Sequence, residues 1–280
     1  MKRISGYALF FVSLGLFLLQ MGYMIFHDSF NVEYSDNRLF FVINMLIVLC
    51  LSFALSLLFT FSKRWKVMGV SGVVAFLLLN IIFGIIHHGK IRNVVSVSPD
   101  FKHLFVMKEK TQTNEAIYYR TYFGILAQPK ERLPYQIGDE YKVEWLVNDV
   151  AAFTYNSPDN KIHQYVGTYG DRGGGGSYYY VGPSIHGKWR GENVTVTTTA
   201  EGITVQEDGE PQSFDWDHVV QFGTLAIVLV NNNQAQWTIA LNENFLIESQ
   251  ETIPPTGEIT LYKATMTDRK PMRLEYHDGD

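Results

Sequence analysis

The residue types needed for acid–base or metal chemistry are densest in one short segment, FDWDH. This segment holds Asp215, Asp217 and His218. Two carboxylates and an imidazole can act as acid and base, or bind a metal ion together. In a strand, Asp215 and Asp217 would point to one side and Trp216 to the other. A solvated strand face over a buried tryptophan gives the same pattern, and we favour that interpretation over a catalytic or metal site.

A second group of ionisable side chains lies where two apolar stretches end. His27 and Asp28 follow the first stretch, and His87 and His88 follow the third. Imidazole is the commonest metal ligand and titrates near neutral pH. If these stretches cross a membrane, the four residues share one depth at its outer face, where they could form a metal or pH-sensing cluster. Histidines at such helix ends are usually without that role, so we assign no metal or cofactor here.

The most unusual segment is YGDRGGGGSYYYVG, residues 169–182. Its candidate recognition residues are Asp171, Arg172, Gly173, Gly174, Gly175, Gly176, Tyr178, Tyr179 and Tyr180. Phosphate-binding glycine loops normally lead into a helix, with Lys or Ser/Thr at a set spacing. Here we expect a tyrosine-rich strand instead, in which Tyr178 and Tyr180 share one face and Tyr179 takes the other. An inert flexible loop is the simpler interpretation. A recognition loop is the functional one, because loops carry function and tyrosine offers rigid amphipathic contact area.

No residue pattern supports hydrolytic chemistry beyond isolated residue types. His163 and His186 lie in or beside expected strands, and no serine or cysteine occurs in a nucleophile-elbow context such as G-x-S-x-G. We therefore name no catalytic residue.

Three apolar stretches free of charged residues occupy the first part of the chain, at about 4–26, 39–61 and 67–86. Each is near the roughly 20 residues that a helix needs to cross about 30 Å of hydrocarbon. Residues 1–88 are therefore predicted to form a three-helix transmembrane anchor. Transport and proton relay usually place ionisable groups at bilayer depth, which these stretches lack.

The basic residues near the spans predict the orientation of the anchor. Cytoplasmic loops are enriched in Lys and Arg. The N-terminus and the second connection carry Lys2, Arg3, Lys63, Arg64 and Lys66. The first connection, residues 27–38, is acidic, although Lys90 and Arg92 after the third span count against the asymmetry. We expect a multi-pass protein of a bacterial plasma membrane, with a cytoplasmic N-terminus and an extracellular C-terminal domain.

Residues 89–280 are predicted to form a β-rich extracytoplasmic domain. The segment 141–147 alternates with period two, and Asp208-Gly209 is a strong hairpin turn between two such segments. We expect an all-β sandwich- or barrel-like domain of about ten strands. Cys50, the only cysteine, lies in the second apolar stretch, so the domain has no disulfide. A chain starting near Val94 is expected to fold alone.

The charge of the β-rich domain narrows its partners. Of the 23 basic and 28 acidic residues, 17 and 25 lie after residue 88. This acidity argues against binding nucleic acid through a broad basic field. The expected partners are the lipid bilayer and another membrane protein. The sequence favours a membrane-anchored extracytoplasmic binding or interaction module, such as an accessory subunit, a sensor ectodomain or an immunity-type factor. A membrane-anchored envelope enzyme that uses carboxylate or histidine chemistry in the β domain is the alternative.

Overall fold

The computed structural model describes residues 2–122, 124–170, 172, 178–246 and 254–277. It divides the chain into two compact units. The first combines Met1–Val95 with Val106–Arg132, and the second combines Ser96–Phe105 with Leu133–Asp280. Each unit is described separately below.

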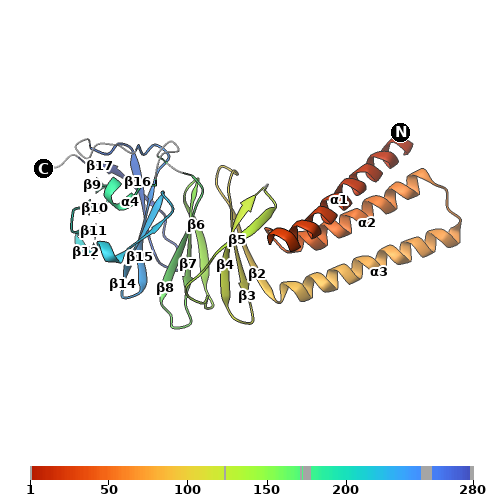
Figure 1. The fold of residues 1–280 in the computed structure, drawn as a ribbon, viewed down its shortest axis with the longest axis horizontal. Coiled ribbons are helices and arrows are strands. Elements are labelled where there is room, and N and C mark those ends of the chain that lie inside the picture. The colour runs from red at the N-terminus through yellow and green to blue at the C-terminus, as the bar shows by residue number, and fades with distance from the viewer. Residues whose placement is uncertain (1, 123, 171, 173–177, 247–253, 278–280) are drawn as a thin grey trace. The chain divides into compact units, whose positions relative to one another are not determined.

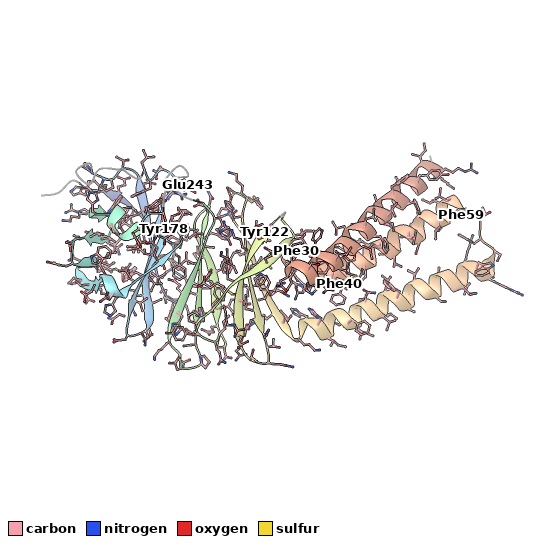
Figure 2. All side chains as sticks on the ribbon, viewed as in Figure 1. Phe30, Phe40, Phe59, Tyr122, Tyr178 and Glu243 are labelled. Carbon is pink, nitrogen blue, oxygen red and sulfur yellow. The ribbon has the colours of Figure 1, made fainter. Side chains whose placement is uncertain are left out.

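The three expected apolar stretches form helices that are long and apolar enough to cross a membrane. They are α1 (Lys2–Phe30), α2 (Arg38–Leu58) and α3 (Lys63–His88). Many of their large apolar side chains are exposed, among them Phe30 at the end of α1 in Figure 2. Such a surface is suited to lipid rather than water. The membrane-helix prediction is confirmed, and α1 and α3 both extend beyond the expected spans.

Helices α1 and α2 pack closely against each other. The hydroxyl of Ser13 donates a hydrogen bond of 3.0 Å to the carbonyl of Ile47 on α2. At Gly6, an added Cβ would lie 2.9 Å from Cγ of Leu58. The absence of a side chain at Gly6 therefore lets the two backbones approach, as small residues do in membrane helix pairs.

A five-stranded antiparallel sheet follows the helices (Figure 1). In spatial order its strands are β1 (Glu33–Tyr34), β5 (Leu126–Arg132), β4 (Glu115–Tyr122), β3 (Leu104–Lys110) and β2 (Ile91–Val97). Strand β1 belongs to the connection between α1 and α2, and Glu33 pairs with Ala127 while Tyr34 pairs with Leu126. This pairing places the connection at the edge of the sheet.

The second unit contains two further antiparallel sheets. The smaller has the order β6 (Tyr141–Val147), β7 (Val150–Asn156) and β8 (Ile162–Thr168). The larger is a nearly closed, barrel-like sheet of nine strands in the order β12-β11-β10-β9-β17-β16-β15-β14-β13. Its strands are β9 (Gly187–Arg190), β10 (Val194–Thr198), β11 (Gly202–Glu207), β12 (Glu210–Asp215), β13 (Val219–Phe222), β14 (Ala226–Asn231), β15 (Gln234–Leu241), β16 (Glu258–Lys263) and β17 (Met272–Tyr276).

The nine-stranded sheet encloses an apolar core around two tryptophans. Trp189 and Trp237 are almost completely buried, together with aliphatic side chains of the neighbouring strands. A short helix, α4 (Val181–Ser184), adds Val181 to this core. The predicted class, an α-helical anchor followed by an all-β region, is confirmed. The described strands exceed the expected number because several, such as β9 and β13, are only four residues long and leave little periodic signal.

Candidate functional site

One side chain of β13 holds the tyrosine segment, residues 178–180, through hydrogen bonds. The amide nitrogen of Gln221 lies 2.9 Å from the hydroxyl of Tyr178 and 3.0 Å from the carbonyl of Tyr179. Its amide oxygen accepts a hydrogen bond of 3.0 Å from the backbone of Val181. A single carboxamide thus holds both the approach to α4 and its first residue.

The three tyrosines lie on opposite sides of this segment. Tyr178 and Tyr180 are 61% and 65% exposed, and their rings meet edge to face with centroids 5.6 Å apart. Tyr179 is partly buried and packs against the tryptophan core. The expected alternation of sides is therefore present, although the expected strand is wrong, because residues 178–180 are irregular and lead into α4.

Arg172 is a clamp within the fold rather than an exposed loop residue. Its guanidinium forms two hydrogen bonds with Asp149, of 2.7 and 2.9 Å, and donates to the carbonyls of Leu241 and Asn242 at 3.0 and 2.6 Å. The side chains of Arg172 and Asp149 are only 7% and 13% exposed. Burial alone would lower the pKa of Arg172, but the hydrogen bonds and charge of Asp149 outweigh it and raise that pKa.

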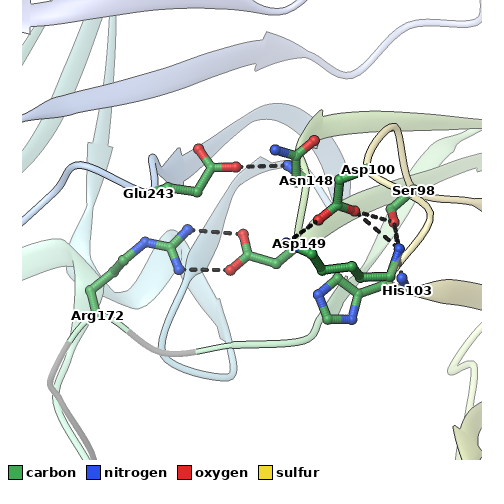
Figure 3. A network of polar contacts seen from close by, with 8 residues as sticks. Ser98, Asp100, His103, Asn148, Asp149, Arg172 and Glu243 are labelled. Carbon is green, nitrogen blue, oxygen red and sulfur yellow. Dashed lines mark hydrogen bonds and ion pairs between the residues drawn. The ribbon is translucent and has the colours of Figure 1, made fainter.

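The clamp belongs to a wider polar network of the second unit (Figure 3). The backbone of Asn148 donates to the carboxylate of Glu243 at 3.1 Å, and the backbone of Tyr169 donates to the carbonyl of Asp149 at 2.9 Å. The ring of Tyr169 stacks on His103, with centroids 5.0 Å apart. These contacts fix the β6–β7 turn and the chain that leaves β8. Asp171 and Gly173, Gly174, Gly175 and Gly176 lie outside the described residues, so their proposed recognition role stays a prediction.

The geometry expected for the FDWDH segment is wrong. Asp215 is the last residue of β12, and Trp216–His218 form a 3-10 turn, so the strand alternation ends before Asp217. The three ionisable side chains are exposed. The indole of Trp216 donates a hydrogen bond of 2.9 Å to the carbonyl of Ala200. Within the described residues, no group of three His, Cys, Asp or Glu could hold a metal ion.

His27 and His87, at the ends of α1 and α3, have separate partners. The Nδ1 atom of His27 lies 2.9 Å from the carbonyl of Val32, and Nε2 of His87 lies 3.3 Å from the amide of Asn37. Asp28 and His88 are exposed. The structure therefore assigns His27 and His87 local contacts at the helix ends.

The first unit contains a buried lysine that the sequence alone does not predict. The ammonium of Lys108, on β3, is 2.6 Å from a carboxylate oxygen of Glu33, 2.7 Å from the carbonyl of Tyr34 and 2.6 Å from the amide oxygen of Asn37. The hydroxyl of Tyr119, on β4, donates to the other oxygen of Glu33 at 3.0 Å. Burial lowers the pKa of Lys108 and the charge of Glu33 opposes that shift. We call Glu33, Asn37, Lys108 and Tyr119 the lysine cluster.

Tyr34 joins the lysine cluster to the membrane helices. Its side chain is fully buried, its ring stacks on Tyr23 of α1 at 4.1 Å, and its hydroxyl donates to Gln20 at 2.8 Å. Burial raises the pKa of Tyr34 to about 12. The α1–α2 connection is thus held both by a membrane helix and by the sheet. The only sequence signal for the buried Lys108 was weak: it lies in the charged run KEK at 108–110, which looks like an ordinary solvated strand.

In comparisons with known proteins, no family model, curated protein or solved structure matches this chain.

Proposed function

We propose that this protein is a membrane-anchored extracytoplasmic binding module of a bacterial envelope, and that Tyr178 and Tyr180 form its contact with a partner membrane protein. The observation that carries the proposal is the exposed, edge-to-face pair of rings on a fixed base. Aromatic side chains are enriched at protein interfaces and often dominate their binding energy.

The contacts that hold the backbone beneath these two rings lower the conformational-entropy cost of binding. Gln221 holds the backbone around Tyr179 and Val181, and the ring of Tyr179 packs into the core. A side chain that is already ordered loses less conformational freedom when it meets a partner. The polar network around Arg172 and Asp149 restrains the other end of the same segment.

The anchor supports the membrane part of this proposal. Three apolar helices keep the β region close to any partner in the same bilayer, which raises the local concentration of one for the other. The acidic β region provides no broad basic field for nucleic acid. The role is therefore that of an accessory subunit, sensor ectodomain or immunity-type factor.

Affinity purification of the tagged full chain in mild detergent tests the recognition surface. The double variant Tyr178→Ala/Tyr180→Ala should lose a co-purifying membrane protein that the wild type retains. Tyr122→Ala is the matched control, because Tyr122 is also an exposed tyrosine. Equal recovery of the same proteins with both variants would remove Tyr178 and Tyr180 from the proposed interface.

The orientation needs its own test. In a Cys50→Ser background, single cysteines at Thr199 and at Lys66 report the two sides of the membrane. A membrane-impermeant maleimide applied to intact cells should label Thr199→Cys and leave Lys66→Cys unlabelled until lysis. The reverse pattern would place the β region in the cytoplasm.

A further inference from the structure

Phe101 has a backbone conformation that its side chain disfavours. Its φ is +61°, in the left-handed region. The other described non-glycine residues with positive φ are all Asn or Asp: Asn31, Asn114, Asn160, Asp208, Asn232 and Asn233. Those residue types tolerate this region, whereas a bulky residue there is an outlier. Phe101 therefore occupies a position at which glycine or asparagine would be more stable.

The turn around Phe101 is built to keep this conformation. The buried hydroxyl of Ser98 donates to Asp100 at 2.7 Å and accepts hydrogen bonds from the backbone of Lys102 and His103, at 3.1 and 2.9 Å. The backbone of Phe101 donates to the carbonyl of Ser98 at 2.9 Å. Figure 3 shows this arrangement beside the ring of His103.

Tyr169 also restrains this turn, which connects β2 and β3. His103 stacks on Tyr169, and the hydroxyl of Tyr169 donates to the carbonyl of Leu104 at 3.2 Å. Strain persists in a protein only where the surroundings over-determine it, and such positions cluster at functional sites. The contacts of this turn hold Phe101 in its strained conformation.

The ring contributes little to the packing of this chain. It is 85% exposed, more than any other large apolar side chain of the described residues, those of the membrane helices included. Polar side chains flank it, since Asp100 and Lys102 pair with each other at 3.2 Å. The strain at Phe101 is therefore not repaid by burial inside the fold.

We infer that Phe101 is an anchor that inserts into an apolar pocket of a protein partner. This inference rests on the proposed binding function and adds a second contact to it. A single projecting ring matches a pocket, and because its turn is already fixed, little ordering cost remains to be met on binding.

A bilayer is the less suitable occupant. Interfacial membrane binding needs a broad apolar face together with basic residues that attract anionic lipid. Here one ring stands between an acidic and a basic residue that neutralise each other, in a region with 25 acidic and 17 basic residues after residue 88. These charges favour a protein pocket over an anionic membrane surface.

Site-specific photocrosslinking in native membranes identifies the occupant. A benzoylphenylalanine placed at Phe101 of the full chain should give one discrete protein adduct, and the same group at exposed Glu210 should not. The protein in that adduct is then purified, and its affinity for wild type and for Phe101→Ala, both in nanodiscs, is measured. Loss of one buried ring should weaken binding by about 10- to 100-fold.

The variants separate binding from folding. Phe101→Gly should also weaken binding, yet its thermal midpoint should equal or exceed that of Phe101→Ala, because glycine relieves the left-handed strain. Phe101→Leu should retain part of the affinity. A lower midpoint for Phe101→Gly than for Phe101→Ala would contradict the strain on which the inference depends.

Other outcomes overturn the inference. Quenching of a Phe101→Trp variant by brominated lipid, beyond that of the wild type with its exposed Trp65 in α3, would identify the bilayer as the occupant. A crosslink between two copies of this chain would identify a dimer. No adduct, or an affinity that Phe101→Ala leaves unchanged, would leave Phe101 without the proposed role. If Tyr178→Ala/Tyr180→Ala still abolishes association in that case, the proposed function stands and only the Phe101 anchor is lost. If neither site matters, both proposals fail.

Discussion

Lys108, a strand residue with a 4% exposed side chain, places its ammonium 2.6 Å from a carboxylate oxygen of Glu33, which lies in the connection between the first two membrane helices. Because Glu33 also pairs across β1 and β5, this ion pair joins the connection to the sheet by side chain as well as by backbone. Whatever its orientation in the bilayer, the connection must therefore lie on the same side as the sheet.

Breaking this pair should destabilise the first unit. Glu33→Gln leaves a buried ammonium without its counter-charge, and removal of one partner of a buried pair costs about 3–5 kcal/mol. We expect a thermal midpoint lower by several degrees in detergent. The double variant Glu33→Gln/Lys108→Met removes the unpaired charge and should recover part of the loss. Additive losses in this cycle would mean that the two side chains do not interact energetically.

A chain starting at Val94, which the sequence alone predicts to fold independently, should have a loosened sheet formed by β5, β4, β3 and what remains of β2. It lacks β1 and the three acceptors of the Lys108 ammonium, so a buried charge is left unpaired. Hydrogen exchange should be fast in residues 106–132 and slow in the nine-stranded sheet. Lys108→Met in the same truncated chain should slow exchange in 106–132. Equal protection in both regions without that substitution would show that the cluster is dispensable.

The lysine cluster should also leave a signature in the pH dependence of stability. The folded-state pKa of Lys108 lies below its ordinary value of 10.5, so below that value the unfolded state binds more protons. Stability from this group therefore rises with pH toward 10.5. The raised pKa of Tyr119 acts oppositely, because its contribution is present below the ordinary value of 10.0 and is lost above it.

Thermal midpoints of the wild type and Lys108→Met, measured between about pH 8 and about pH 10, isolate the lysine contribution. The midpoint of the wild type should rise relative to that of the variant as the pH increases. Parallel curves would indicate that Lys108 has the same pKa in both states. Thr199→Ala, a substitution outside the cluster, is the control and should follow the wild type.

Arg172→Ala should harm folding as well as binding, unlike substitution of the exposed tyrosines. It leaves the carboxylate of Asp149 without its partner and frees the carbonyls of Leu241 and Asn242. We expect a loss of about 3 kcal/mol, seen as a lower unfolding midpoint, whereas Tyr180→Ala should leave the midpoint nearly unchanged. Arg172→Lys should recover little, since an ammonium cannot reproduce the bidentate geometry. An unfolding midpoint unaffected by Arg172→Ala would mean that Arg172 does not stabilise the fold and remains only a candidate recognition residue.

The membrane helices and the all-β class could be predicted because both depend on local patterns. A run of about 20 apolar residues or an alternating strand identifies itself without knowledge of its partners. The opposite sides of Tyr178 and Tyr179 followed from the same reasoning, although the strand itself was absent.

The polar clusters could not be predicted because their partners are distant in the sequence. Nothing near Lys108 indicates Glu33, and nothing near Arg172 indicates Asp149. The FDWDH segment failed for a different reason. The alternation of polar and apolar residues continues in the sequence after the strand has ended at Asp215. The periodicity therefore suggested a strand face shared by Asp215 and Asp217, which the backbone does not form.

The pairing of β1 with β5 also sets an order of assembly. The ribosome makes Glu33 and Tyr34 long before Leu126 and Ala127, so the first connection must wait as an unpaired edge while two more helices insert. The sheet can be completed only if the intervening helices return the chain to the side where that edge is waiting. A copy with a missed or inverted span cannot close the sheet and keeps an exposed strand edge, which is prone to pair with other chains. Pairing of β1 with β5 therefore requires the residues before α2 and the residues after α3 to emerge on the same side of the membrane.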